Sequence, residues 1–456
     1  MGTSINKTAA IAAIGLAMIP GVGLSQDEAD TGGLVLTFGI SSTLTFDDNF
    51  ELAEGGSPGD STIWDTGLSF RVQSVTPTES FDLLASSVLR WADLPTRSVT
   101  GFEDPTVALT YRREGAASLF TAEARIRSVD LEFLGPLSDP GGPGNDLGTL
   151  DEKTARVTLE TGIGEPLGVR LTAGYADSDY SDTVDPDLFD STETDVGARV
   201  NFRVTPVAVA FVDLSRTWYS DEDVGNKDET TDTLSVGVDY EADRRTRLSL
   251  SVGYSVVNTN EFGIDTENDG IVYSLGAERD LPNGTVSVLL TSELDEDDAI
   301  TTLTFGRTME LPRGRLEGEI GVTQLANGSR GLIGSLTYGQ DLRNDRIEVT
   351  LDRSFATDDG NDEINTRLGV TYAHDIDASS TLGVEFAYAV TEDGGVGTTP
   401  TEQEASLRAS YTREITRDWN LEGGVIFRYS DDESVPGTAR SNAVYLTIGR
   451  EFSFRP

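Results

Sequence analysis

Residues 248–256 read Leu-Ser-Leu-Ser-Val-Gly-Tyr-Ser-Val, so every second residue is apolar and the residues between are small or polar. Successive side chains of an extended strand point to opposite faces, so this stretch predicts a β-strand with one apolar and one polar face. The same parity recurs at 303–311, 347–352 and 382–390. Strands with two unlike faces are therefore the main element that the sequence predicts.

The connections between these strands alternate in length. Between Leu34 and Phe454 we count about 22 candidate strands, within a range of 18 to 24. Short turns on one side alternate with long polar connections on the other, and both chain ends lie on the short-turn side. The long connections are 47–60, 138–152, 176–195, 220–232, 258–270, 391–404 and 430–438. This layout predicts an up-and-down meander of antiparallel hairpins.

The meander favours a membrane barrel over soluble β-folds. After residue 25 no stretch approaches the roughly 18 to 20 apolar residues of a spanning helix, and the hydrophobic share of 37% is below the roughly 45 to 50% of globular proteins. A sheet with lipid on one face and water on the other has such a composition. It must also close into a barrel, because the unpaired backbone groups of an open edge strand are too costly in the hydrocarbon core. We predict an all-β, transmembrane, antiparallel up-and-down barrel over 34–456. A propeller needs four short strands per repeat; a soluble sandwich or adhesin stays an alternative.

The N-terminal residues predict export. Lys7 precedes the apolar run 8–24, and Gly23-Leu24-Ser25 offers a cleavage site, so 1–25 is predicted to be a signal peptide. Pro20 disfavours the alternative, a membrane-anchoring helix. Residues 26–33 would be a short periplasmic segment, which leaves no room for a separate plug domain before the barrel.

Composition excludes several classes of function. The chain has no Cys, one His and a formal charge of −44, so disulfides, thiolate chemistry and multi-histidine metal clusters are excluded. Nucleic acid is not an expected partner, because its binding depends on Lys and Arg at phosphates.

The C-terminal strand carries the most specific motif. Thr447, Gly449, Phe452 and Phe454 form the pattern polar-x-Gly-x-x-aromatic-x-aromatic, which resembles the insertion signal of bacterial outer-membrane β-barrel proteins. The resemblance implies the barrel-assembly machinery as a partner. Phe452 and Phe454 share the parity of the apolar face, so we expect them at the lipid boundary, where aromatic rings prefer to lie. The sequence departs from the family pattern by ending in Arg455-Pro456.

A second resemblance lies near the first strand. Asp47-Asp48-Asn49 follows Thr45-Phe46 and is similar to a motif of porin-like outer-membrane barrels that are often associated with exopolysaccharide systems. The alternative is a solvated strand end with turn-forming Asp and Asn residues.

Catalysis is not predicted. His374 shares parity with Leu368 and Val370, so we expect an imidazole at the membrane boundary. Carboxylate pairs such as Glu317 with Glu319 are expected by chance among 78 acidic residues, and they are interpreted as part of a hydrated inner wall.

No cofactor is expected, and a metal site is a weak hypothesis. Asp265, Glu267 and Asp269, followed by Gly270, resemble the first half of a calcium loop, although Gly276 stands where that loop needs Glu. These residues suggest a site that binds Ca²⁺ loosely. The alternative interpretation is an exposed acidic loop that binds no metal ion.

Charge and aromatic residues predict orientation and partners. The connection 176–195 holds acids and no base, whereas short turns hold Arg, as at 112–113 and 343–346. We expect long acidic loops outside a Gram-negative outer membrane and short turns in the periplasm. The acidic rim would attract divalent cations that bridge it to surface glycolipid, and Trp91, Trp218 and Trp419 would form an aromatic belt in the lipid.

The predicted function follows from the size of the barrel. About 22 strands enclose a lumen wider than side chains can fill, which predicts a porin-like channel for passive passage of small hydrophilic solutes, with a preference for cations. The alternatives are an exit barrel for an exopolysaccharide and a non-conducting scaffold or adhesin.

Overall fold

The computed structural model describes residues 33–53, 57–134, 147–183, 188–223, 225–296, 298–358, 361–393, 402–432 and 437–456. These residues form one 22-stranded sheet and one helical turn, α1 (Leu131–Leu134). The strands are β1 (Gly33–Asp47), β2 (Ser61–Val75), β3 (Glu79–Asp93), β4 (Ser98–Glu114), β5 (Ser118–Asp130), β6 (Thr149–Thr161), β7 (Leu167–Ser181), β8 (Ser191–Thr205), β9 (Ala208–Asp221), β10 (Asp228–Asp243), β11 (Thr246–Glu261), β12 (Ile264–Leu281), β13 (Gly284–Leu294), β14 (Ala299–Leu311), β15 (Gly314–Gln324), β16 (Arg330–Asp341), β17 (Asp345–Asp358), β18 (Asn361–Asp377), β19 (Ser380–Asp393), β20 (Glu402–Thr416), β21 (Trp419–Asp432) and β22 (Ala439–Phe454). No helix among these residues has the length and apolar character that are needed to cross a membrane.

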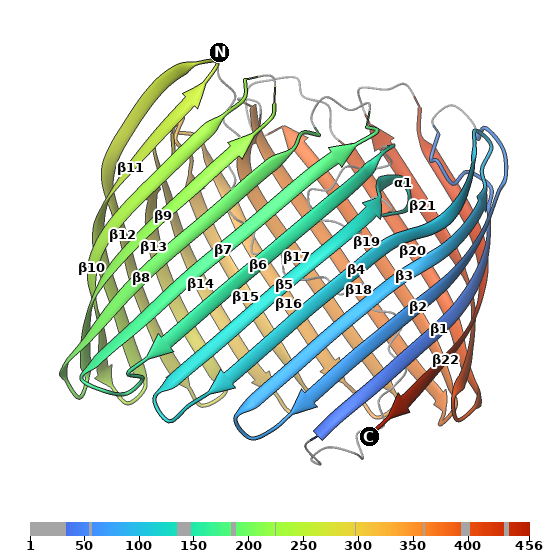
Figure 1. Cartoon of the computed structure of the whole chain (residues 1–456), viewed down its shortest axis with the longest axis horizontal. Helices are drawn as coiled ribbons and strands as arrows, with labels where there is room; N and C mark the ends of the chain where they lie inside the picture. Colours follow the sequence, from blue (N-terminus) through green and yellow to red (C-terminus); the bar gives the residue numbers. More distant parts are fainter. Residues whose placement is uncertain are drawn as a thin grey trace.

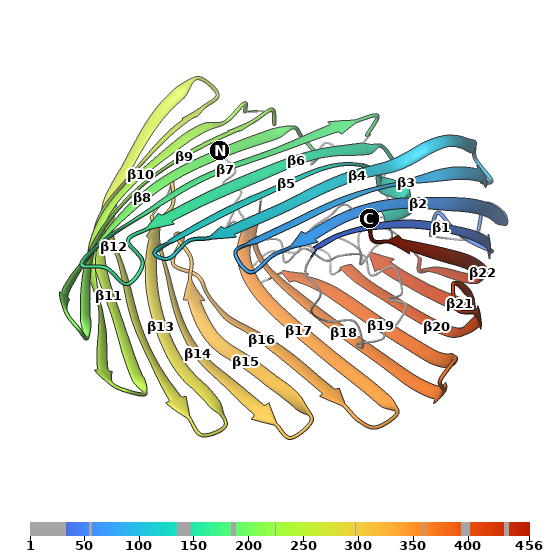
Figure 2. The same cartoon turned by 60° about the horizontal axis from the view of Figure 1, so that its bottom comes forward.

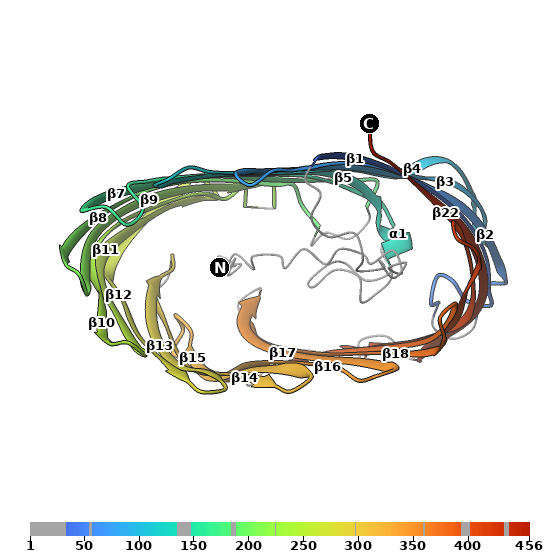
Figure 3. The ribbon, with the colours of Figure 1, turned by 90° about the horizontal axis from the view of Figure 1, so that it is seen from below.

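The sheet closes on itself. Each strand pairs antiparallel with its neighbours in the chain, and β1 pairs with both β2 and β22 (Figure 1). At this seam Thr43 is opposite Thr447 and Phe38 is opposite Phe452. The predicted closed meander of 22 strands is therefore confirmed. Seen end-on, the barrel is a flattened ring (Figure 3).

The two faces of the wall differ as the alternation predicts. On β11, Leu250, Val252 and Tyr254 are about half exposed, and their side chains share one face because they are two residues apart. The exposed apolar residues of the other strands continue this face around the ring. We call this apolar face the outer face and the opposite face the lumen face. Because residues paired across neighbouring strands lie on the same face, the register extends this assignment from β11 to the residues of all the other strands.

The two rims also differ. The rim that carries the start of β1 and the end of β22 has tight turns, such as 206–207 and 244–245; it lies at the bottom of Figure 1 and is turned toward the viewer in Figure 2. The opposite rim carries the longer connections, including 48–60 and 131–148. We call these the turn rim and the loop rim.

Several predicted long loops are shorter than expected; the predicted loop 220–232, for example, is reduced to 222–227 between β9 and β10. Residues 258–270 were expected to be a loop, but β11 and β12 continue through them to a turn at Phe262–Gly263, where Gly263 has a φ of 72°. Likewise β7 and β8 extend into 176–195 and leave only 182–190 between them. The reason is that strands whose side chains are polar can still pair through their backbones in water. Asn258 of β11, for example, pairs with Glu267 of β12.

Candidate solute pathway

The lumen face is lined by polar side chains. At three places hydroxyl groups on neighbouring strands form hydrogen bonds across it, each with an oxygen-to-oxygen distance of 2.9 Å. The pairs are Thr43 with Thr447, Thr233 with Ser255, and Thr302 with Thr323. Cross-strand hydroxyl pairs of this kind stabilise a sheet while leaving a wettable surface. The inner wall is therefore suited to contact with hydrophilic solutes.

Charge is distributed unevenly around this face. The register places carboxylates on the lumen face of β12 to β19 with few arginines between them: Glu278, Glu293, Glu310, Glu317, Glu319, Glu348, Asp352 and Glu385. The wall from β3 to β8 carries arginines on the lumen face: Arg90, Arg112, Arg125, Arg127, Arg156, Arg170, Arg199 and Arg203. Several of these are neutralised by carboxylates of the same wall, as Arg156 is by Asp195 at 3.1 Å. An excess of negative charge thus remains on the opposite wall.

A small apolar core lies inside the loop rim. α1 is directed into the ring (Figure 3), and the rings of Phe133 and Phe50 lie 5.0 Å apart. Both pack on the buried residues Ile63, Ala92 and Leu94 of the β2–β3 wall and the connection that follows it. α1 and the start of the first connection at Phe50 are therefore attached to the lumen face on this side of the ring.

Arg90 fixes this core to the wall. Its guanidinium carbon lies 3.6 Å from the centroid of the Phe133 ring, and its nitrogens contact Asp65 at 3.0 Å and Asp104 at 2.9 Å. Asp104 occupies a β-bulge in β4 with a φ of 51°. The bulge turns this carboxylate toward Arg90, which is the kind of redirection that bulges provide.

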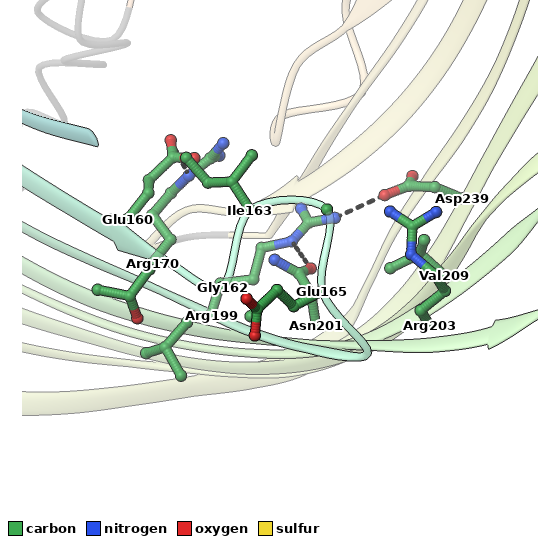
Figure 4. Close-up of a pocket in the computed structure, with 14 residues that line it drawn as sticks. Glu160, Gly162, Ile163, Glu165, Arg170, Arg199, Asn201, Arg203, Val209 and Asp239 are labelled. Atoms are coloured by element: carbon green, nitrogen blue, oxygen red, sulfur yellow. Dashed lines mark hydrogen bonds and ion pairs between the residues drawn. The ribbon is translucent and has the colours of Figure 1, made fainter. Parts of the chain in front are cut away.

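A pocket with three arginines opens on the lumen face at the turn rim (Figure 4). It has a volume of about 460 Å³ and lies between the β6–β7 turn and β7, β8 and β10. Arg170 donates from Nε to Glu160 at 2.7 Å, and Arg199 donates from Nη2 to Asp239 at 2.8 Å. Arg203 also lines the pocket and is exposed. We call this site the arginine pocket.

The Arg199 side chain is held rigidly. Its guanidinium carbon lies 3.6 Å from the centroid of the Phe211 ring, and its Nε donates to the Asn201 side-chain oxygen at 3.1 Å. Phe211 in turn lies over Gly237, where an added Cβ would come within 2.3 Å of the ring. Gly237 therefore makes room for the aromatic ring on which the arginine stacks.

The Asp47-Asp48-Asn49 motif lies in the seam between the first and last strands. Asp47 accepts hydrogen bonds from Arg428 at 2.8 Å and from Ser441 at 2.7 Å, and Asp48 accepts from the Asn442 backbone at 2.7 Å. The Asn49 side chain donates to the Arg440 carbonyl at 3.0 Å. The motif therefore joins the first connection to β21 and β22, a structural role that its residue types alone do not indicate.

The C-terminal motif is split between the two faces. Phe452 and Phe454 lie exposed on the outer face, and the Phe452 ring is 6.2 Å from that of Phe38. Thr447 and Gly449 lie on the lumen face. A Cβ at Gly449 would meet only ordinary contacts at 3.7 Å, so the closed barrel does not itself require glycine there.

The expected belt residues lie near strand ends. Trp91 and Trp218 are exposed on the outer face near the loop rim, and Trp64 is the cross-strand partner of Trp91. Trp419 begins β21 at the turn rim, with the Arg450 guanidinium 5.5 Å from its ring centroid. His374 shares the outer face with Leu368, and its Nδ1 lies 2.8 Å from Asp345. The belt itself stays a prediction.

The calcium candidates lie on a strand and not in a loop. Asp265, Glu267 and Asp269 occupy alternate positions of β12 and face outward near the loop rim. Alternate residues of a strand are about 6.6 Å apart, so their carboxylates do not converge; Asp265 instead accepts from Asn260 at 2.5 Å. Among the residues that the structure describes, no three carboxylate or imidazole groups are placed to hold a metal ion together.

One titratable group of the loop rim is strongly perturbed. Burial raises the pKa of Asp295, in the β13–β14 connection, to about 6. The neighbouring Glu296 is paired with Lys227 at 2.7 Å. The charge of Asp295 therefore changes near pH 6, at the loop rim.

Comparison with known proteins gives fold likeness only. No family model and no curated protein sequence matches this chain. The solved structures that resemble it include the ferric-catecholate import receptor Fiu of E. coli K12, at 12% identity and a TM-score of 0.58, covering 91% of this chain and 81% of the receptor. The FrpB iron transporter of Neisseria meningitidis matches at 9% identity and a TM-score of 0.57, covering 93% and 82%. The copper transporter OprC matches at 12% and 0.53, covering 93% and 81%.

The observation that decides the fold is the pairing of β1 with β22, which closes a ring with an apolar outer face. The chain has the fold of a bacterial outer-membrane β-barrel. The predicted signal peptide at 1–25 and the segment 26–32 lie outside the described residues of this outer-membrane barrel.

The arginine pocket was not found from the sequence. The parity of β7 and β8 assigns Arg170, Arg199 and Arg203 to the lumen face, and that signal was present in the sequence. Their convergence with Asp239 on β10 depends on the register of two further strand pairings, β8–β9 and β9–β10, which alternation does not define.

Proposed function

We propose that this outer-membrane barrel is a channel for passive passage of small hydrophilic solutes, with a preference for cations. The observation that carries the proposal is a polar lumen face, rich in carboxylates, inside a closed ring of 22 strands. Rings of this size enclose more space than wall side chains fill. The proposal includes a lumen that no separate plug domain fills, and an outer membrane whose lipid and glycolipid contact the apolar face.

The preference for cations is inferred from the wall between β12 and β19. Carboxylates on one wall of a water-filled path raise the local concentration of cations. Glu319 and Glu348 are on the lumen face there, whereas Glu267 faces outward near the loop rim. Glu319 and Glu348 therefore offer a test of the lumen charge, with Glu267 as a control.

The experiment is conductance and reversal potential in planar bilayers under a KCl gradient. We expect steady open-channel current with K⁺ favoured over Cl⁻, and a reduced preference in the double variant Glu319→Gln/Glu348→Gln. The Glu267→Gln variant should match the wild type. Absence of current would contradict the channel and leave a scaffold or adhesin, and a preference for Cl⁻ would contradict the electrostatic argument.

A second candidate is uptake of a metal complex, favoured by the fold likeness to a ferric-catecholate import receptor and a copper transporter. Retention of a ferric-catecholate complex by the purified barrel, together with absence of current, would support it over the channel. Export of an exopolysaccharide is less favoured, because the Asp47-Asp48-Asn49 motif that suggested it lies in the seam. Loss of polymer secretion in a deletion strain would restore that alternative.

A further inference from the structure

We propose that the arginine pocket binds the carboxylate group of a small organic solute. The pocket lies on the lumen face at the turn rim, where a solute that has crossed the barrel would leave it. The route of the solute to this site rests on the proposed channel function, but binding is measurable without transport.

The arrangement of charges is the first argument. Arg170 and Arg199 are directly opposite each other on neighbouring strands, and Arg203 follows on the same face of β8. Like charges placed opposite each other destabilise a sheet. Glu160 and Asp239 each offset one charge of this pair, and an anion among the three arginines would offset the charge of Arg203 and receive several charge-assisted hydrogen bonds.

The available donors are the second argument. Arg170 uses Nε for Glu160, and Arg199 uses Nε and Nη2 for Asn201 and Asp239. In the part of the chain that the structure describes, no ion pair engages the guanidinium of Arg203. Terminal nitrogens of all three arginines thus remain for a ligand, and the planar guanidinium suits the two oxygens of a carboxylate.

The lining defines the rest of the ligand. Ile163 and Val209 supply apolar surface beside the guanidinium groups, which favours an organic anion over inorganic phosphate. Glu160 and Asp239 are already paired with arginines, and the side chain of Glu165 on the β6–β7 turn is directed away from Arg203 (Figure 4). The volume of about 460 Å³ fits a small solute.

The test is calorimetric titration of the purified full chain in non-ionic detergent with sodium butyrate. We expect saturable binding by the wild type and affinity lower by about tenfold or more in Arg203→Gln, since that variant loses charge-assisted hydrogen bonds to the carboxylate. Arg247→Gln is the matched control, because Arg247 lies on the lumen face at the same rim and pairs with Asp280 at 3.1 Å outside the pocket. That variant should bind butyrate as the wild type does.

Three results would overturn the assignment: no saturable binding of butyrate, equal loss in Arg203→Gln and Arg247→Gln, or phosphate binding as tightly as butyrate. Heat-dependent electrophoretic mobility establishes that each variant is folded. Should Arg203→Gln fail to fold, Arg170→Lys gives the same test, because lysine retains the charge and loses the fork of donors. Butyrate binding without bilayer current would contradict the channel and leave the pocket assignment standing.

Discussion

Asp47 and Arg428 form an ion pair of 2.8 Å across 381 positions of the chain. Their side chains are only 3% and 11% exposed. The same arginine also donates to the Phe50 carbonyl at 3.0 Å. One guanidinium therefore holds the end of the first strand, the first connection and the last hairpin together at the loop rim.

Loss of this pair should open the seam. Because removing one partner leaves a buried charge uncompensated, Asp47→Asn should lower the free energy of unfolding by about 3–5 kcal/mol, measured by urea titration of the barrel in detergent. The exposed pair Arg71–Asp82 is the control, and Asp82→Asn should cost less than about 1 kcal/mol. Equal effects of the two variants would show that Asp47 has no special role in closure.

The C-terminal aromatics should matter more for assembly than for stability. Phe452 and Phe202 are similarly exposed on the outer face, at 42% and 45%, so truncation of either should change stability by a similar amount, about 1 kcal/mol for the lost aromatic contact of Phe452 with Phe38. In cells, Phe452→Ala should reduce the folded fraction in the outer membrane several-fold, whereas Phe202→Ala should not. Immunoblots of heat-modifiable protein measure both, and equal yields would contradict an assembly signal at Phe452.

The core inside the loop rim should control the width of the pathway. Phe133→Ala removes the ring that packs on Phe50 and under Arg90, so α1 loses its attachment to the wall. We expect a single-channel conductance higher than that of the wild type and a loss of about 1–3 kcal/mol in stability. Ile126→Ala, at an outer-face residue that is 58% exposed, should leave conductance unchanged; a change there as large as in Phe133→Ala would argue against the constriction.

Asp295 should make stability depend on pH. Its folded-state pKa of about 6 exceeds the unfolded value of about 3.9, so the folded state binds the proton more tightly. This contribution to stability is complete below about pH 4 and is lost as the pH rises through about 6. Asp295→Asn should therefore raise the Tm at pH 7.5 and have little effect at pH 4. Asp298→Asn, at an exposed position of the same connection, should show no such difference, and a uniform effect of Asp295→Asn at both pH values would contradict the burial argument.

The wall was predictable because the bilayer imposes a rule on every strand. Leu248, Leu250 and Val252 must face lipid, so parity alone assigns Ser249 and Ser251 to the lumen. At the strand ends near the loop rim, beyond the apolar band of the outer face, that rule no longer applies. Polar ladders such as Asn258 opposite Glu267 have no apolar signature, and the sequence therefore indicated a loop where the strands continue.

The sites depended on register and could not be read from residue types. Asp47 and Arg428 meet only because β1 closes on β22 and β21 follows it, and the arginine pocket needs β7 to β10 in one alignment. Motif chemistry suggested a metal site at Asp265, Glu267 and Asp269, but strand geometry separates those carboxylates. Spacing along the chain predicts a shared site only when the backbone conformation is known.

Closure of the wall is tested most directly by a disulfide across the seam, which the cysteine-free chain makes possible without background thiols. Thr43 and Thr447 face each other in the lumen with hydroxyl oxygens 2.9 Å apart, whereas Ile448 points to the outer face. We predict that Thr43→Cys/Thr447→Cys oxidises to an intramolecular cross-link, seen as a mobility shift of the unfolded chain, and that Thr43→Cys/Ile448→Cys does not. Failure of the first pair to cross-link in folded protein, or equal cross-linking of both, would contradict a closed barrel with this register.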